Sequence, residues 1–124
     1  MKYMRIYTGT DGESHFEDVE LPMKSPIPPF NTPLDGLIKR SEVIKANGIS
    51  FNEYPPGMDW GCHTAPRRQF VICLEGKVEF TTSQGIKRRF GAGDILLAED
   101  TTGKGHKWKI VGRKKAKGVH VPLE

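Results

Sequence analysis

The sequence predicts a single-domain, all-β protein built as a sandwich or barrel. From residue 69 onward, short apolar segments recur at steady spacing and are separated by glycine-containing turns, a pattern typical of β-sandwiches and barrels. No segment combines helical capping residues with apolar residues at helical spacing. The chain has 124 residues, enough to bury the core of one domain and too few for two.

The first part of the chain, residues 1–40, is expected to pack on the barrel as an N-terminal strand and a proline-rich arm. Residues 4–8 have the composition of a short strand, whereas residues 15–21 keep the alternation of a strand only in part. Residues 24–34 contain four prolines, which exclude helix and remove backbone hydrogen-bond donors. This arm is expected to extend over the surface, to close over the mouth of the barrel, or to swap onto a partner subunit.

The remaining residues, 41–124, are expected to form the barrel itself. Apolar residues return within residues 41–51, where Asn47-Gly48 is a turn signal. Further strands are predicted at residues 70–74, 77–81, 86–90, 95–98, 106–111 and 116–121. In the strand that begins at His106, alternation puts Trp108 on the same face as His106. We therefore expect Trp108 to face the interior.

Composition restricts the partners of the protein. The net charge of +4 is uneven, because residues 104–117 carry seven basic residues and no acidic one. Such a stretch can attract nucleic acid or an anionic substrate, face solvent, or pair with acids elsewhere. No helix-turn-helix or RNA-binding signature accompanies it, so nucleic acid is not expected as a partner. No apolar run approaches the roughly 20 residues that span a membrane.

The N-terminus and the cysteines bear on the compartment. The first twelve residues lack the apolar core of a secretory signal, so a cytoplasmic location is expected. Cys62 and Cys73 form no Cys-x-x-Cys pair, and we expect free thiols packed in or near the core, with Cys62 the more accessible.

One stretch, residues 57–76, places candidate ligands beside a bend. His63 and Gln69 stand on either side of Pro66. At about 3.3 Å per residue, a straight strand would hold them roughly 20 Å apart. They can serve one site only if the chain turns between them. Pro66, followed by Arg67 and Arg68, is the predicted corner.

This arrangement resembles the first conserved motif of the cupin family, in which glycine, His-x-His, Glu and a second glycine follow at fixed spacing. The corresponding residues here are Gly57, His63, Ala65, Gln69 and Gly76. Ala65 thus replaces the second histidine, and the neutral Gln69 replaces the carboxylate.

The second cupin motif, a glycine followed by Pro-x-Gly-x-x-His, is similar to the stretch from Gly93 to His106. The intervening loop is two residues longer than the family pattern, and Glu99 stands in place of the proline. Ile110 replaces the asparagine that can follow the histidine. The two motifs in order imply a single-domain cupin-like β-barrel, a double-stranded β-helix or jelly roll, with an internal cavity. The resemblance also implies a homodimer.

For the site, the resemblance implies a divalent metal, Fe, Mn, Ni or Zn, held by His63, Gln69 and His106. Loss of one imidazole and one negative charge should weaken this site. The family hosts isomerases, lyases and dioxygenases, and the sequence does not choose among them. We also expect Arg67 and Arg68 to anchor an acidic substrate, because a guanidinium suits bidentate binding of a carboxylate or phosphate.

Other interpretations of these residues stay open. A metal-free module that binds a small organic anion would use the same arginines, Gln69 and the histidines, with Trp108 toward the ligand. A third interpretation is a dimeric scaffold with a vestigial cavity. Trp60 could line the cavity or pack in a dimer interface, and packing is expected. His15 and His120 are expected to be surface or packing residues.

Overall fold

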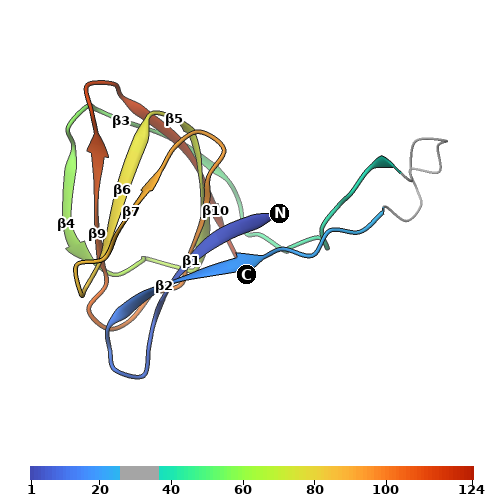
Figure 1. Ribbon diagram of the computed structural model, residues 1–124, viewed down its shortest axis with the longest axis horizontal. Helices are drawn as coiled ribbons and strands as arrows, with labels where there is room; N and C mark the ends of the chain where they lie inside the picture. Colours follow the sequence, from blue (N-terminus) through green and yellow to red (C-terminus); the bar gives the residue numbers. More distant parts are fainter. Residues whose placement is uncertain (26–36) are drawn as a thin grey trace.

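The computed structural model describes residues 1–25 and 37–124, which form two facing β-sheets (Figure 1). The six-stranded sheet, in the order β2-β1-β8-β5-β10-β3, contains β1 (Lys2–Thr8), β2 (Ser14–Glu20), β3 (Ser50–Tyr54), β5 (Gln69–Glu75), β8 (Ile95–Ala98) and β10 (Ala116–Pro122). The four-stranded sheet, in the order β4-β9-β6-β7, contains β4 (Asp59–His63), β6 (Lys77–Thr82), β7 (Lys87–Phe90) and β9 (His106–Val111). The all-β prediction is confirmed.

The strands after residue 69 lie where short apolar segments between glycine turns predict them. The observed β8 and β9 have the predicted bounds, β6, β7 and β10 differ by one residue at one end, and β5 is longer by one residue at each end. The sequence did not reveal β4, because Gly61 interrupts its alternation. This strand forms by pairing with β9, across a register shift between Trp60 and His63.

The apolar segment at residues 41–51 needs a correction. Only its end belongs to a strand, since β3 begins at Ser50. Upstream, Ala46 forms an isolated bridge with Leu123, and Val43 and Ile44 are exposed. These apolar residues therefore do not belong to the core of this chain.

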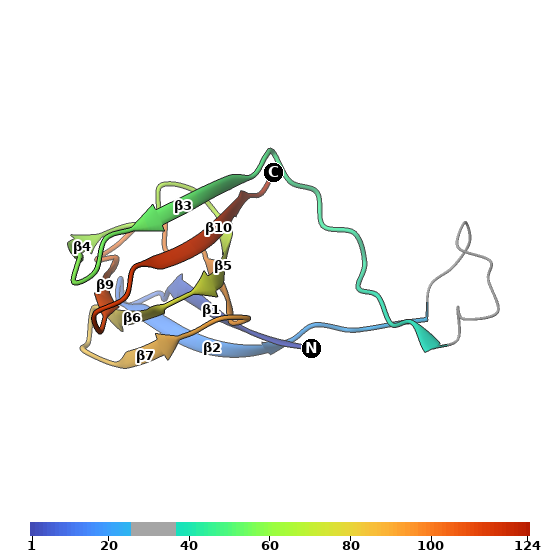
Figure 2. The same cartoon turned by 90° about the horizontal axis from the view of Figure 1, so that it is seen from above.

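The N-terminal hairpin belongs to the six-stranded sheet. Strand β1 lies between β2, with which it pairs antiparallel, and β8, with which it pairs parallel. The proline-rich arm predicted at residues 24–34 lies, from residue 26 onward, outside the described residues. On its two sides Lys24 and Arg40 form a backbone bridge, and the chain here extends away from both sheets (Figure 2).

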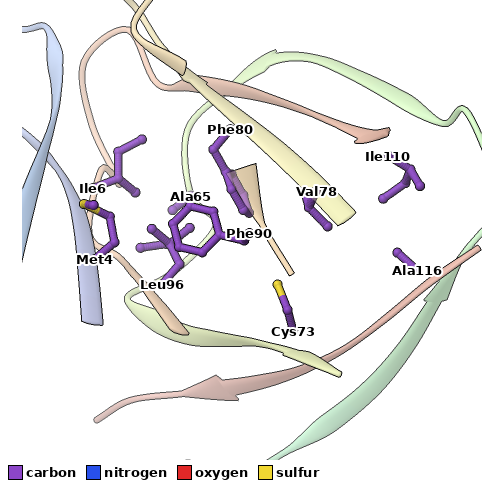
Figure 3. Packing of buried hydrophobic residues seen from close by; sticks show 11 residues of the cluster. Met4, Ile6, Ala65, Cys73, Val78, Phe80, Phe90, Leu96, Ile110 and Ala116 are labelled. Atoms are coloured by element: carbon purple, nitrogen blue, oxygen red, sulfur yellow. The ribbon is translucent and has the colours of Figure 1, made fainter. Parts of the chain in front are cut away.

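The core fills part of the space between the sheets (Figure 3). Phe80 of β6 contacts Phe90 of β7 in an edge-to-face pair, with ring centroids 5.1 Å apart. Opposite them lie Ile6 of β1 and Leu96 of β8, both almost completely buried. Ala65, at the position of the second cupin histidine, is 3% exposed and packs in the same cluster.

The basic stretch at residues 104–117 pairs in part with acids from distant strands, as one interpretation predicted. The pairs in this stretch are Lys104–Glu13, Lys109–Glu79, Lys115–Glu53 and Lys117–Glu75. Among the described residues, no helix is long and apolar enough to cross a membrane.

Candidate functional site

A cavity of about 520 Å³ lies between the two sheets and is lined by residues of both. Apolar and aromatic side chains form most of its wall, among them Tyr54, Trp60, Val71, Val78, Phe80, Leu96 and Trp108. Its polar side chains include His63, Arg67, Gln69, His106, Lys117 and His120. A wall of apolar groups with a few convergent polar ones is characteristic of small-molecule sites.

The two predicted ligand histidines are neighbours at one end of this cavity. His63 of β4 and His106 of β9 pair across the antiparallel ladder, and their ring centroids lie 4.9 Å apart. His63 Nδ1 lies 2.8 Å from the carbonyl oxygen of Gly61. His106 Nδ1 lies 2.5 Å from a carboxylate oxygen of Asp100.

These contacts determine which ring nitrogens can accept a proton or a ligand. A carbonyl and a carboxylate only accept hydrogen bonds, so each Nδ1 must carry hydrogen. In the neutral rings, the Nε2 atoms of His63 and His106 therefore present lone pairs. Neither Nε2 has a hydrogen-bond partner in the part of the chain that the structure describes.

Asp100 positions the ring of His106 through a hydrogen bond. It follows β8 in the loop that leads to β9, and its side chain is fully buried. Its Oδ2 atom binds His106, while Oδ1 has no hydrogen-bond partner among residues 1–25 and 37–124. Its backbone oxygen accepts a hydrogen bond from the amide of Ala65. Asp100 thus connects the His106 side chain to the corner that joins β4 to β5.

Gly105 allows this end of the cavity to close. Its φ is +72°, and a Cβ atom built on it would lie 2.2 Å from the carbonyl oxygen of His63. Gly103 is similar, since a Cβ there would lie 2.6 Å from the carbonyl oxygen of Gly12. The glycines before His106 are thus needed for close backbone packing, which is a stricter requirement than loop flexibility.

Gln69 also lines the cavity. It is 8% exposed, and its side chain makes no hydrogen bond within the described residues. The three predicted metal ligands, His63, Gln69 and His106, therefore border one space. Their donor set is two imidazole nitrogens and an amide oxygen, which can hold a divalent cation weakly because no ligand is negatively charged. Within the described residues, no group of three or more His, Cys, Asp or Glu could hold a metal ion.

Arg67 and Arg68, the two residues predicted to anchor an acidic substrate, lie in different environments. Arg67 lines the cavity, whereas Arg68 does not and its Nε lies 2.5 Å from Glu99. Arg5 binds the other oxygen of Glu99 at 2.6 Å. Burial alone would raise the pKa of the Glu99 carboxyl, but the hydrogen bonds from Arg68 and Arg5 outweigh it and lower that pKa. Arg68 therefore serves a surface ion-pair network.

Two tryptophans form one aromatic wall. Trp108 lines the cavity, and its ring stacks on Trp60 with centroids 5.7 Å apart. Tyr54 meets Trp108 edge to face at 5.0 Å. Trp60 is 47% exposed and also borders the cavity, so its ring lies at the mouth as well as packing on Trp108. An apolar or aromatic ligand body would find a matching surface here.

Sequence reasoning missed two polar residues of the cavity, Tyr54 of β3 and His120 of β10. Burial, and to a lesser extent the charge of Arg67, lowers the pKa of His120 below its ordinary value. Alternation in β10 gave no signal for His120, because the apolar Val119 and Val121 flank it, whereas Gly118, His120 and Pro122 line the cavity. No local pattern indicates Tyr54, which reaches His120 only through the pairing of β3 with β10.

Both cysteines are free. Cys73 is buried, and burial raises its pKa to about 11, so this thiol is neutral at physiological pH. Cys62 is exposed and its Sγ lies 3.0 Å from the backbone oxygen of Lys104.

No protein-family model and no curated protein matches the sequence. The chain is similar to solved structures. One is an uncharacterized conserved protein with a double-stranded β-helix domain from Klebsiella pneumoniae, with 26% identity, a TM-score of 0.50, and coverage of 68% of this chain and 74% of the other. Another is a Cupin 2 conserved barrel domain protein from Salinispora arenicola, with 19% identity, a TM-score of 0.52, and coverage of 83% and 73%. Together with the two facing sheets, these likenesses show that the chain has a cupin-like fold.

Proposed function

We propose that the cavity binds a small organic anion. The observation that carries this proposal is the charge of the cavity wall. Its charged side chains are Arg67 and Lys117, both cationic, and no carboxylate of the described residues lines it. Lys117 also lies 3.5 Å from Glu75, so Arg67 is the principal anchor.

The shape and polarity of the wall support an acid with an apolar body. A guanidinium presents paired donors that match the two oxygens of a carboxylate. The stacked rings of Trp60 and Trp108 offer a flat apolar surface. A volume of about 520 Å³ is within the range of small-molecule sites. A monocarboxylic acid with an aromatic or branched apolar body would suit both features.

The test compares an acid with its neutral amide. Trp60 and Trp108 are the two tryptophans of the chain and both line the cavity, so their fluorescence reports on its occupancy. We expect benzoate to bind at least about tenfold more tightly than benzamide, as a hydrogen-bonded charge contributes roughly 1.5–3 kcal/mol. If neither these probes nor a panel of aliphatic and aromatic carboxylates binds, the proposal fails and a vestigial cavity becomes the better account.

A second candidate function is a metal-assisted enzyme that uses His63, Gln69 and His106. The specific observation in its favour is the orientation of the two imidazoles, whose Nδ1 atoms are occupied by Gly61 and Asp100. Both Nε2 lone pairs are thereby available, and Asp100 would support His106 as carboxylates support metal-binding histidines. A bound cation would polarise a carbonyl or enol oxygen of the substrate. Isomerase, lyase and dioxygenase chemistry all stay open.

Gln69→Glu tests this second candidate. The change restores one negative charge to the donor set, and ligand charge strongly affects the affinity for divalent cations. If a metal binds here, its affinity should rise about tenfold or more, measured by calorimetry with Mn²⁺ and Zn²⁺. Gln84→Glu, on an exposed turn, is the matched control and should change nothing. Equal affinities for both variants and the wild-type protein would place any bound metal elsewhere.

We further propose a homodimer built on the outer face of the six-stranded sheet. Neighbouring strands place Phe51, Val119, Ile72 and Ile95 in one row, on the face opposite the cavity-lining Val71 and His120. Phe51 is 74% exposed, Ile72 and Ile95 are half-buried, and Val119 is already buried within this chain. An apolar row of this kind is typical of a surface covered by a partner. Sedimentation equilibrium should give twice the chain mass of 13.9 kDa; a monomer at micromolar concentration would refute the proposal.

A further inference from the structure

Three polar side chains form a chain of hydrogen bonds along the side of the cavity made by β3 and β10. Asn52 Nδ2 donates to the hydroxyl oxygen of Tyr54, at 3.1 Å. The same hydroxyl lies 2.9 Å from His120 Nε2. Tyr54 and His120 both line the cavity together with Arg67. These hydrogen bonds have no role in the candidate metal site, and they do not form the stacked aromatic wall.

The direction of these bonds follows from counting protons. An amide nitrogen of Asn52 can only donate, so Tyr54 accepts from it. The only other partner of the hydroxyl among the described residues is His120 Nε2. The tyrosine proton therefore has an acceptor only if Nε2 carries a lone pair. Tyr54 thus donates to His120, and the hydrogen of the neutral His120 ring lies on Nδ1.

The neutral ring of His120 can donate a hydrogen bond from Nδ1 without carrying a charge. Burial, and to a lesser extent the charge of Arg67, lowers the pKa of His120, so the ring is neutral at neutral pH. Its Nδ1–H group has no partner within the described residues. A polar donor at a partly buried position that borders a cavity is most readily satisfied by a ligand or water.

We propose that His120 Nδ1–H and the Arg67 guanidinium together form the carboxylate-binding subsite of the cavity, with Tyr54 and Asn52 as positioning residues that maintain the required histidine tautomer. This inference rests on the proposed binding of an organic acid and specifies where its carboxylate lies. The ligand class is a monocarboxylic acid whose apolar body extends along Trp108 toward the His63–His106 end. Two donors, one charged and one neutral, suit the two oxygens of a single carboxylate.

The first test needs no ligand. Two-bond nitrogen–proton NMR spectra of the imidazoles distinguish the two tautomers, and we expect His120 to be protonated on Nδ1 in the wild-type protein at pH 7.5. Tyr54→Phe removes only the hydroxyl and keeps the ring against Trp108. In that variant the proton should move, at least in part, to Nε2. An Nε2–H tautomer in the wild-type protein would overturn the inference.

The second test measures benzoate affinity by tryptophan fluorescence. Tyr54→Phe should weaken binding about threefold to tenfold, the loss expected for one neutral hydrogen bond. His120→Phe should weaken it by a similar or larger factor, whereas His120→Asn, whose amide replaces the Nδ1–H donor, should recover most of the affinity. Tyr7→Phe, in β1 outside the cavity lining, is the control and should bind like the wild-type protein.

The outcomes separate this inference from the proposed function. If the wild-type protein binds benzoate and both Tyr54→Phe and His120→Phe bind it equally well, the subsite is refuted and organic-acid binding stands. If the wild-type protein binds no carboxylate, both fail. Thermal unfolding midpoints within a few degrees of the wild-type value show that the variants remain folded, so that lost affinity reports on the site.

Discussion

Gly105→Ala is expected to lower the free energy of unfolding by about 3 kcal/mol or more. The residue has a φ of +72°, a conformation that costs a non-glycine residue about 1–2 kcal/mol. A Cβ atom would also lie 2.2 Å from the oxygen and 2.4 Å from the carbon of the His63 carbonyl. These are backbone atoms of β4, so relief requires β4 and the turn before β9 to separate, which adds an overpacking cost of about 1–3 kcal/mol. Urea denaturation measures the change.

Gly112→Ala is the matched control. Gly112 has a φ of +86°, and an added Cβ would meet no atom of the described chain within 4 Å. Gly112→Ala therefore carries only the conformational cost, about 1–2 kcal/mol. The difference between the two variants therefore measures the close contact between Gly105 and His63. Equal losses of stability in the two variants would show that this contact does not constrain the histidine end of the cavity.

Arg67→Ala is expected to weaken benzoate binding about 10- to 100-fold, whereas the neighbouring Arg68→Ala should change it less than about threefold. Arg67 lines the cavity, and a hydrogen-bonded charge contributes roughly 1.5–3 kcal/mol. Arg68 is bound to Glu99, which also binds Arg5. An exposed ion pair of this kind affects stability by at most about 1 kcal/mol. Calorimetric titration of both variants gives the affinities.

The two variants are well matched, because they remove the same side chain at adjacent positions and change the net charge equally. If benzoate bound only through general electrostatic attraction to the basic protein, both substitutions would weaken binding by the same small factor. Binding would then also depend strongly on salt concentration. That result would contradict a specific role of Arg67. A larger loss in Arg68→Ala would show that the guanidinium that contacts Glu99 in this structure turns to the ligand.

Much of the fold could be predicted from the sequence where alternation and turn residues act locally. The strands from β5 to β10 are of this kind, because short apolar segments and the glycine turns between them mark their positions. Strand β4 is different, because its position depends on pairing with β9 across a register shift. The apolar residues at 41–49 misled for a different reason: apolar character predicts burial, yet Val43, Ile44 and Ile49 are exposed in this chain.

The sequence predicts the candidate site only through the spacing of its candidate ligand residues along the chain. The positions of His63, Gln69 and His106 follow from two motifs, and the structure brings these residues to one cavity. Arg67 and Arg68 are identical in chemistry, and their separation depends on Glu99, which lies 31 residues from Arg68. The contact between Tyr54 and His120 spans 66 residues. Such contacts arise from sheet pairing, which no local pattern encodes.

The most direct test of the account is benzoate titration of wild-type protein before and after exhaustive dialysis against a chelator. The central claim is that the side chains of the cavity, with Arg67 as anchor, bind the acid without a metal. The account predicts the same dissociation constant in both preparations, and no change when Mn²⁺, Fe²⁺, Ni²⁺ or Zn²⁺ is added back. Binding that disappears on dialysis and returns with one of these ions would contradict it and favour the metal site of His63, Gln69 and His106.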